Sequence, residues 1–324
     1  MGTPEVSVII PVYNRASMLR EAIASVLQQT DVSFELIVVD DGSTDSGCDG
    51  LEAWVNASTP ASMTNFALLH RLKNRGVAHA RNRGVAMASA PLIAFLDSDD
   101  LWAPAKLARQ LAFMHSTPDC MITQTEEIWI RDGRRVNPGV RHRKRSGDIF
   151  LDSLRTCLIS PSAVMMRGDL FRQIGGFDER MTAAEDYDLW LRILRHHEVG
   201  LLDEPLVRRR AGHRGQLSAD TPAIDRFRIL ALLKLLYAFD LSPERRLATV
   251  EVLIEKCRIY GKGLHRRDDN ASAEFILQVA NLAWEWVSEP DDSLTSATLR
   301  MSELLATTGE NSRTESTAPL EVRA

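Results

Sequence analysis

A short apolar run that stops on three aspartates constrains this chain more than any other stretch. Residues 92–96 have the length and composition of a buried strand. Asp97, Asp99 and Asp100 follow within four residues, and carboxylates this close together repel one another. The side chains of Asp97 and Asp99 point the same way in extended backbone, so this pair can hold Mg²⁺ or Mn²⁺. The alternative is a helix N-cap at Asp99 or Asp100 that leads into a helix over 101–114.

The composition is that of an ordinary globular protein. The 324 residues suffice for one large domain, or for one domain with an appendage. Hydrophobic residues make up 44% and charged residues 26%, and a net charge of −5 gives no reason to expect a nucleic-acid partner. The four cysteines are widely spaced and form no C-x-x-C pair, which favours a reduced, cytoplasmic setting.

The sequence carries no sign of membrane insertion. No basic leader precedes the first apolar run, and no apolar run is long enough to cross a bilayer. We therefore expect a cytoplasmic protein that meets any lipid-linked partner at the inner face of the membrane.

Strands and helices alternate along the first hundred residues. We expect strands at 6–12, 34–39, 66–69 and 92–96, with helices between them. This order predicts an α/β fold with a doubly wound, mainly parallel, Rossmann-like sheet. Ligands of such sheets bind outside the carboxyl ends of the strands, where Tyr13, Asp40–Asp41 and Asp97–Asp99 lie. The chain has neither G-x-G-x-x-G nor a P-loop, which argues against dinucleotide enzymes and P-loop NTPases.

Four motifs carry a family resemblance: Val6–Asn14, Val38–Asp45, Asn74–Asn82 and Phe95–Asp100. Their order and spacing resemble the family 2 inverting glycosyltransferases of GT-A fold, over roughly the first 215 residues. The resemblance implies a nucleotide-sugar donor, usually a UDP-sugar, with Mn²⁺ or Mg²⁺ bridging its diphosphate.

The resemblance also assigns the donor-binding residues. Tyr13 and Asp41 would bind the base together with Pro11, and Arg81 would support the donor site. Asp97 would contact the ribose or the sugar, beside Ser98, and Asp99 would coordinate the metal. His213, which lies next to a run of arginines, would join the metal or a phosphate; the alternative is a structural histidine.

Glu185 and Asp186 form the second chemical centre, at the start of an expected helix. Acids at this position complement the helix dipole in any protein. The resemblance instead implies that Asp186 is the general base of a single displacement, and that Glu185 orients the acceptor or the loop. The acceptor would be a glycan, a lipid-linked molecule or another hydroxyl. The basic run 141–145 is typical of a solvated loop, and an anionic or lipid-phosphate acceptor is its alternative use.

The pattern changes to helices beyond Asp220. We expect a GT-A catalytic domain over 1–218, a helical C-terminal extension over 219–306 and a polar, disordered tail over 307–324. Whether the extension caps the catalytic domain, forms a dimer or lies on a membrane stays open, as does the oligomeric state.

The sequence therefore predicts a metal-dependent inverting glycosyltransferase of cell-surface polysaccharide or glycolipid biosynthesis. The alternative enzyme class is a nucleotidyltransferase, which requires a glycine-rich basic loop where this chain has Pro11–Asn14. The rival outside catalysis is a sugar-nucleotide-binding or scaffolding protein without turnover.

Overall fold

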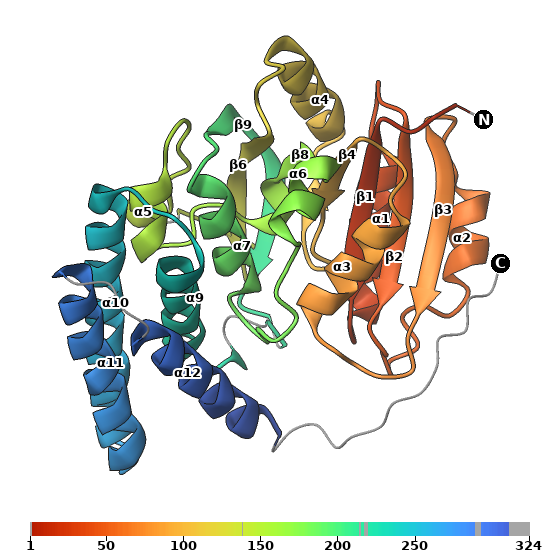
Figure 1. Ribbon diagram of the computed structural model, residues 1–324. Helices are drawn as coiled ribbons and strands as arrows, with labels where there is room; N and C mark the ends of the chain where they lie inside the picture. Colours follow the sequence, from red (N-terminus) through yellow and green to blue (C-terminus); the bar gives the residue numbers. More distant parts are fainter. Residues whose placement is uncertain (1, 138, 214, 217–219, 289–292, 311–324) are drawn as a thin grey trace.

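The structure is a computed structural model that describes residues 2–137, 139–213, 215–216, 220–288 and 293–310. A nine-stranded mixed sheet runs through the described part of the chain, in the order β3-β2-β1-β4-β8-β6-β9-β5, with β7 paired to β6. Helices cover both faces of the sheet, and four longer helices pack at the side of its second half (Figure 1).

The first half of the sheet is parallel and confirms the doubly wound prediction. Its strands pair β3-β2-β1-β4, all in one direction. The strands and the helices between them are β1 (Val6–Val12), α1 (Ala16–Leu27), β2 (Phe34–Asp40), α2 (Leu51–Ala57), β3 (Met63–His70), α3 (Val77–Met87) and β4 (Leu92–Phe95).

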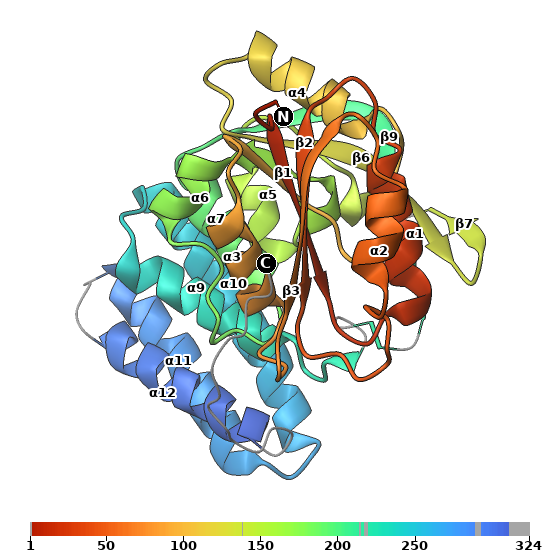
Figure 2. The same cartoon turned by 90° about the vertical axis from the view of Figure 1, so that its right-hand side faces the viewer.

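Alternate side chains of β1 enter two separate cores, as the strand period of two requires. Val8 and Ile10 pack with α1 and α2 on one face, and Ile9 packs with α3 on the other. Figure 2 shows α1 and α2 on one side of these strands and α3 on the other. Helix α3 approaches the sheet closely at Gly84, where a Cβ atom would lie 2.4 Å from Cγ2 of Ile9. Only glycine allows this approach.

The strand order places β1 beside β4, although they are not consecutive in sequence. The connections leave these two strands in opposite directions, which makes this the switch point of the sheet. The loops after β1 and β4 therefore open at the same edge.

The second half of the sheet is mixed. Strand β8 is antiparallel to β4 and β6, whereas β6 and β9 run parallel. Its elements are β5 (Leu101–Trp102), α4 (Lys106–Ser116), β6 (Ile122–Arg131), β7 (Arg134–Val136), α5 (Phe150–Arg155), β8 (Met165–Arg167), α6 (Gly168–Ile174), α7 (Glu185–Leu194) and β9 (Val199–Ala211), with short 3-10 turns at Val140–His142 and Pro161–Ala163.

The helix expected over 101–114 is wrong in its first turn. Leu101 and Trp102 form strand β5 against β9, and α4 begins only at Lys106 without a side-chain cap. Trp102 is buried and its indole N–H donates to the Ser162 carbonyl at 2.7 Å, which holds this segment extended. The N-cap alternative for Asp99 and Asp100 is therefore also wrong.

The C-terminal helices are α9 (Asp225–Ala238), α10 (Pro243–His265), α11 (Asn270–Ser288) and α12 (Ser293–Glu310). Their apolar side chains share one hydrophobic core with α7, so they pack directly on the helix that starts with Glu185. The boundary expected at 218 falls outside the described residues. Helix α12 continues beyond the boundary expected at 306, and residues 311–324 of the expected tail also lie outside the described residues.

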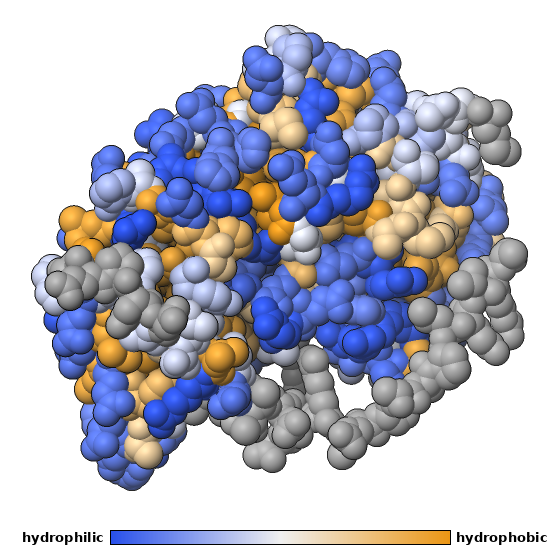
Figure 3. All heavy atoms as spheres, viewed as in Figure 1, coloured by the Kyte–Doolittle hydropathy of each residue, from blue (hydrophilic) through white to orange (hydrophobic). Residues whose placement is uncertain are grey.

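No helix in the described part of the chain is long and apolar enough to span a bilayer. Hydrophilic residues dominate the face shown in Figure 3, and apolar areas appear over the C-terminal helices. The exposed large apolar side chains of these helices include Ile259, Leu277, Trp284 and Leu299.

Candidate active site

The loops after β1 and β4 meet the end of β9 at the switch-point edge. Arg15 Nη1 donates to His213 Nδ1 at 2.8 Å, and Arg15 Nη2 lies 3.6 Å from Asp99 Oδ2. His213 Nε2 lies 2.8 Å from the same Asp99 oxygen. The structure thus brings together Asp99 and His213, which are 114 residues apart in the sequence. Sequence reasoning missed Arg15, although its place directly after β1 was a usable signal.

The three aspartates after β4 form a cluster of oxygen ligands. One ligand atom from each of Asp97, Asp99 and Asp100 lies within 4.8 Å of the others. Burial and the charge of Asp97 raise the pKa of Asp99, whereas Arg15 and His213 lower it. Because the carboxylates carry excess negative charge in a partly buried place, the donor set fits a hard divalent cation.

Asp100 differs from its two neighbours because the fold uses both of its oxygens. Oδ2 accepts from the Ser162 hydroxyl at 2.6 Å, and Oδ1 accepts from the backbone N–H of Arg210 at 2.9 Å. Asp97 and Asp99, with His213, therefore remain the side chains that fit a cation.

Arg81 joins this cluster to the start of α7. Its Nη2 donates to Asp97 Oδ1 at 2.7 Å and its Nη1 to Glu185 Oε1 at 2.6 Å. The guanidinium is buried and lies 5.2 Å from the ring centre of Phe177. Burial raises the pKa of Glu185 to about 7 although Arg81 lowers it. Glu185 is thus buried and held by Arg81, the same side chain that holds Asp97.

Asp186 lies in the first turn of α7 and is partly exposed. Its Oδ1 accepts from the Tyr187 N–H at 2.7 Å, and the Cys157 thiol donates to its Oδ2 at 3.6 Å. Ala184, the residue before the helix, has a φ of 56°, in the left-handed region that non-glycine residues avoid. Strain of this kind gathers at functional sites.

The residues predicted to hold the base lie in β1 (Pro11) or directly after β1 and β2 (Tyr13 and Asp41). Tyr13 is 45% exposed at the end of β1, and Pro11 is buried within that strand. Asp41 is buried and accepts from the backbone N–H groups of Arg75 at 3.0 Å and Gly76 at 2.7 Å. Burial raises the pKa of Asp41, and these hydrogen bonds lower it.

Ser98 is buried in the loop after β4, next to the partly exposed Asp97. The structure therefore gathers the predicted residues along one edge, from Tyr13 to the aspartates and on to α7.

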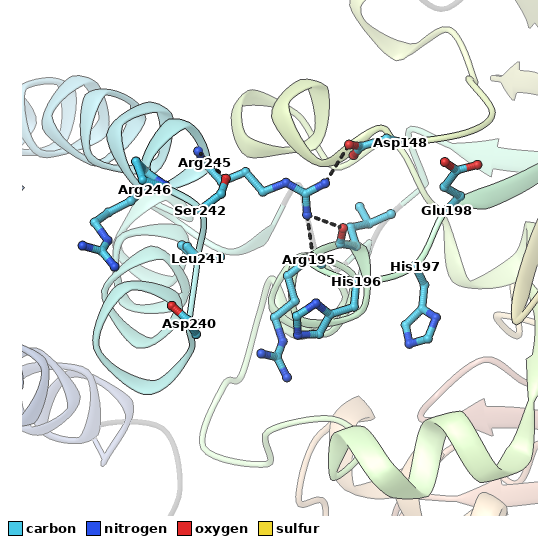
Figure 4. Close-up of a pocket in the computed structure, with 12 residues that line it drawn as sticks. Asp148, Arg195, His196, His197, Glu198, Asp240, Leu241, Ser242, Arg245 and Arg246 are labelled. Atoms are coloured by element: carbon cyan, nitrogen blue, oxygen red, sulfur yellow. Dashed lines mark hydrogen bonds and ion pairs between the residues drawn. The ribbon is translucent and has the colours of Figure 1, made fainter.

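A cavity of about 670 Å³ lies elsewhere, between the end of α7 and the start of α10 (Figure 4). Arg245 crosses it and donates to Asp148 and to the Arg195 carbonyl, both at 2.6 Å. Three arginines in its lining are matched by three acids: Arg195, Arg245 and Arg246 against Asp148, Glu198 and Asp240. The cavity holds none of the predicted site residues and has the balanced charge of a junction between packed elements.

The structure also reveals a link between α7 and the C-terminal helices. The Lys234 Nζ of α9 lies 2.6 Å from Asp178 Oδ2 and 2.7 Å from Asp188 Oδ1. Asp188 follows the predicted base Asp186 by two residues in α7. The sequence pointed to this link only through Lys234, a lone charged residue inside the apolar stretch that forms α9.

The fold and its edge site define a GT-A glycosyltransferase architecture, and solved structures agree. S. aureus TarS 1-349, in complex with UDP-GlcNAc, superposes with a TM-score of 0.69 and 18% identity, over 95% of this chain and 92% of that one. A mannosyltransferase from Pyrobaculum calidifontis superposes with a TM-score of 0.56, over 96% of this chain and 88% of that one.

The sequence comparison names the family. The family described as "Glycosyl transferase family 2" matches residues 7–175, and the chain therefore belongs to glycosyl transferase family 2. An uncharacterized glycosyltransferase of Rickettsia conorii is 37% identical over 64% of this chain and 33% of its own length. The glucosyltransferase WfgD of Escherichia coli is 30% identical over 61% of this chain and 73% of its own length. The chain spans about a third of the length of the first curated relatives that it matches.

Proposed function

We propose that this protein transfers a sugar from a nucleotide-diphosphate sugar, a UDP-sugar, to an acceptor hydroxyl with inversion at the anomeric carbon. The observation that carries this proposal is the Arg81 bridge, which holds Asp97 of the donor edge against Glu185, the neighbour of Asp186. Two carboxylate groups with different tasks thereby share one site. The names of relatives support the donor, since WfgD uses UDP-Glc and TarS was solved with UDP and UDP-GlcNAc.

The donor lies along the switch-point edge in this proposal. The exposed ring of Tyr13 stacks on the base, and Asp41 accepts the imide hydrogen of uracil beside Pro11. Asp41 is held for this task by the N–H groups of Arg75 and Gly76. Asp97, with Ser98 behind it, contacts the ribose or sugar, and Arg81 fixes the orientation of Asp97.

We assign the metal to Asp99 and His213, with Asp97 alongside; Mn²⁺ or Mg²⁺ suits these ligands. When bound, the cation supplies positive charge to the diphosphate leaving group. Arg15 contacts both Asp99 and His213 and so positions them. The Pyrobaculum mannosyltransferase was solved with GDP-Man and Mn²⁺, which supports a metal in this fold.

Asp186 is the general base in this account. Inverting transfer is a single displacement, so one carboxylate must take the proton of the acceptor hydroxyl. No second nucleophilic carboxylate is required, and Glu185 is already committed to Arg81. Glu185 therefore serves as a positioning residue. We place the reaction in the cytoplasm, in cell-surface polysaccharide or glycolipid synthesis, in line with the names of WfgD and of the teichuronic acid protein TuaG.

The test is a screen of nucleotide sugars for release of the nucleoside diphosphate, with Mn²⁺ and with Mg²⁺. We expect UDP release from one UDP-sugar, with loss of release in EDTA. Tight binding of UDP-sugars without any release would favour a non-catalytic binding or scaffolding protein. Release of pyrophosphate from a nucleoside triphosphate would instead indicate a nucleotidyltransferase.

A further inference from the structure

A second cavity of about 340 Å³ lies between β6 and the basic segment 139–144. Its lining includes Glu126, Glu127, Trp129, His142, Arg143 and Lys144. Lys144 is buried, and its Nζ lies 3.2 Å from Glu127 Oε1, whereas Arg141 and Arg143 of the same run are exposed. The basic run is therefore partly a wall of this cavity rather than a wholly solvated loop.

Arg209 of β9 stands next to this cavity, opposite Trp129 in the strand pairing. Its guanidinium lies 4.9 Å from the centre of the Trp129 ring. The ring is fixed in turn, because its Nε1 donates to Glu127 Oε2 at 3.0 Å and His142 packs 5.2 Å away. Within the part of the chain that the structure describes, the Arg209 guanidinium makes no hydrogen bond or ion pair of its own.

The wall of the cavity is joined to the segment that contacts Asp186. Lys144 Nζ donates to the Leu158 carbonyl and to Ser160 Oγ, both at 3.1 Å, and the preceding Cys157 contacts Asp186. The charge of Arg209 agrees with this placement. Burial lowers the pKa of its guanidinium, but the carboxylates of Glu127, Asp100, Asp97 and Asp186 together raise it above the ordinary value. The side chain therefore lies within electrostatic reach of both the aspartate cluster and the proposed base.

Two further cations, Lys144 and Arg228, act electrostatically on the partly buried Cys157 thiol, which contacts Asp186. Each of them has a carboxylate partner: Lys144 pairs with Glu127, and Arg228 lies 3.0 Å from Asp225. Arg209 alone among these three cations has its hydrogen-bond donors left for a ligand.

We propose that Arg209 binds a phosphate group of the acceptor, so that the cavity between β6 and residues 139–144 takes a sugar linked to a phosphate or diphosphate. This inference rests on the proposed function, because it identifies the substrate class of the same site. A planar guanidinium held by stacking presents paired N–H donors to phosphate oxygens. The exposed Arg141 and Arg143 extend the positive charge outward from the cavity.

The same chemistry could come from a lipid-linked glycosyl diphosphate or from a free glycosyl phosphate. The experiment therefore compares three acceptors for each sugar of a small panel: the methyl glycoside, the glycosyl 1-phosphate and the farnesyl diphosphate-linked glycoside. Transfer is followed with the UDP-sugar found in the donor screen, and binding of the 1-phosphate to enzyme saturated with UDP and Mn²⁺ is measured by calorimetry. Faster transfer to the farnesyl compound than to the 1-phosphate would identify the lipid-linked source.

We expect phosphorylated acceptors to exceed their methyl glycosides at least tenfold in kcat/KM. Arg209→Ala should remove this preference, and Arg209→Lys, which keeps the charge, should restore part of it. Arg208→Ala is the matched control, since Arg208 is the exposed neighbour on the same strand. UDP affinity with Mn²⁺ should be equal in all four proteins, which also verifies that each is folded.

Three results with the acceptors would overturn the inference: methyl glycosides as good as the phosphorylated acceptors, a preference that survives in Arg209→Ala, or neither binding nor transfer of any phosphorylated acceptor. A tenfold loss of UDP affinity in Arg209→Ala would also overturn it, by assigning Arg209 to the donor. Failure of the proposed function is a separate result, because wild-type protein would then release no UDP from any UDP-sugar.

Discussion

Arg81 on α3 and Glu185 at the first position of α7 form a buried ion pair, with 2.6 Å between Nη1 and Oε1. The same guanidinium holds Asp97 at 2.7 Å. One side chain therefore sets the distance between the donor edge of the sheet and the helix that carries Asp186.

Replacing Arg81 should damage chemistry more than donor binding. Arg81→Met keeps the length of the side chain but releases Asp97 and Glu185 and leaves Glu185 buried without its partner. We expect UDP-sugar transfer to fall by about 100-fold, because small misplacements of reacting groups are costly. Unfolding in urea should show a loss of about 3 kcal/mol. Arg109→Ala, which removes an exposed arginine paired with Glu204, should change neither quantity appreciably; equal effects in both variants would contradict the bridging role.

His213 should matter only when the metal is present. His213→Ala removes a nitrogen that lies 2.8 Å from Asp99 Oδ2. We expect the affinity for UDP in Mn²⁺ to drop about tenfold, the cost of one lost charge-assisted interaction. Titration of UDP in EDTA should show no difference from wild type. His196→Ala at the distant cavity is the control, and a similar loss there would argue against a specific site at the sheet edge.

The C-terminal helices should stabilise α7 through Lys234. Lys234→Met leaves Asp178 and the buried Asp188 short of a partner, so we expect about 3 kcal/mol less stability at pH 7. The exposed Lys262→Met on α10 is the matched control. If Lys234→Met had the same free energy of unfolding as wild type, this contact would not be what holds the helices together.

The contact between Lys234 and Asp178 should also make the free energy of unfolding depend on pH. Burial raises the pKa of Asp178, but hydrogen bonds from Arg180 and Lys234 outweigh burial and hold it below the ordinary value. Asp178 therefore stabilises the fold when ionised, fully above its ordinary pKa of about 4. This stabilisation is lost as the pH falls toward the lowered value. Urea unfolding at pH 7, 5 and 3 should show a smaller loss with acid in Lys234→Met than in wild type; parallel curves would contradict the assignment.

Local sequence was enough to predict the parallel half of the sheet. The apolar runs around Val8, Leu36 and Ile93 are buried on both faces, so composition alone reveals them as strands. It also placed the aspartates correctly at a strand end. The strand at Leu101 could not be predicted, because its partner Arg208 lies more than a hundred residues away. A strand of two residues is also too short to show an alternating hydrophobic pattern.

The contacts of the site could not be predicted in the same way. The resemblance pointed to Arg81 and Glu185 separately, but their pairing joins residues 104 positions apart and leaves no local pattern. Arg209 was one of three consecutive arginines in the sequence. Only the fold separates them, because it lays Arg209 on Trp129, sends Arg210 to the Asp99 carbonyl and leaves Arg208 exposed.

The most direct test of the account is a calorimetric titration of UDP with Mn²⁺ into wild type, Asp99→Ala and Asp186→Asn, followed by transfer assays on each. Asp99→Ala should lose metal-dependent binding of UDP. Asp186→Asn should keep the affinity of wild type and lose transfer at least 100-fold. Undiminished UDP binding by Asp99→Ala, or undiminished transfer by Asp186→Asn, would contradict the division of the site into a metal-bearing donor side and a base on α7.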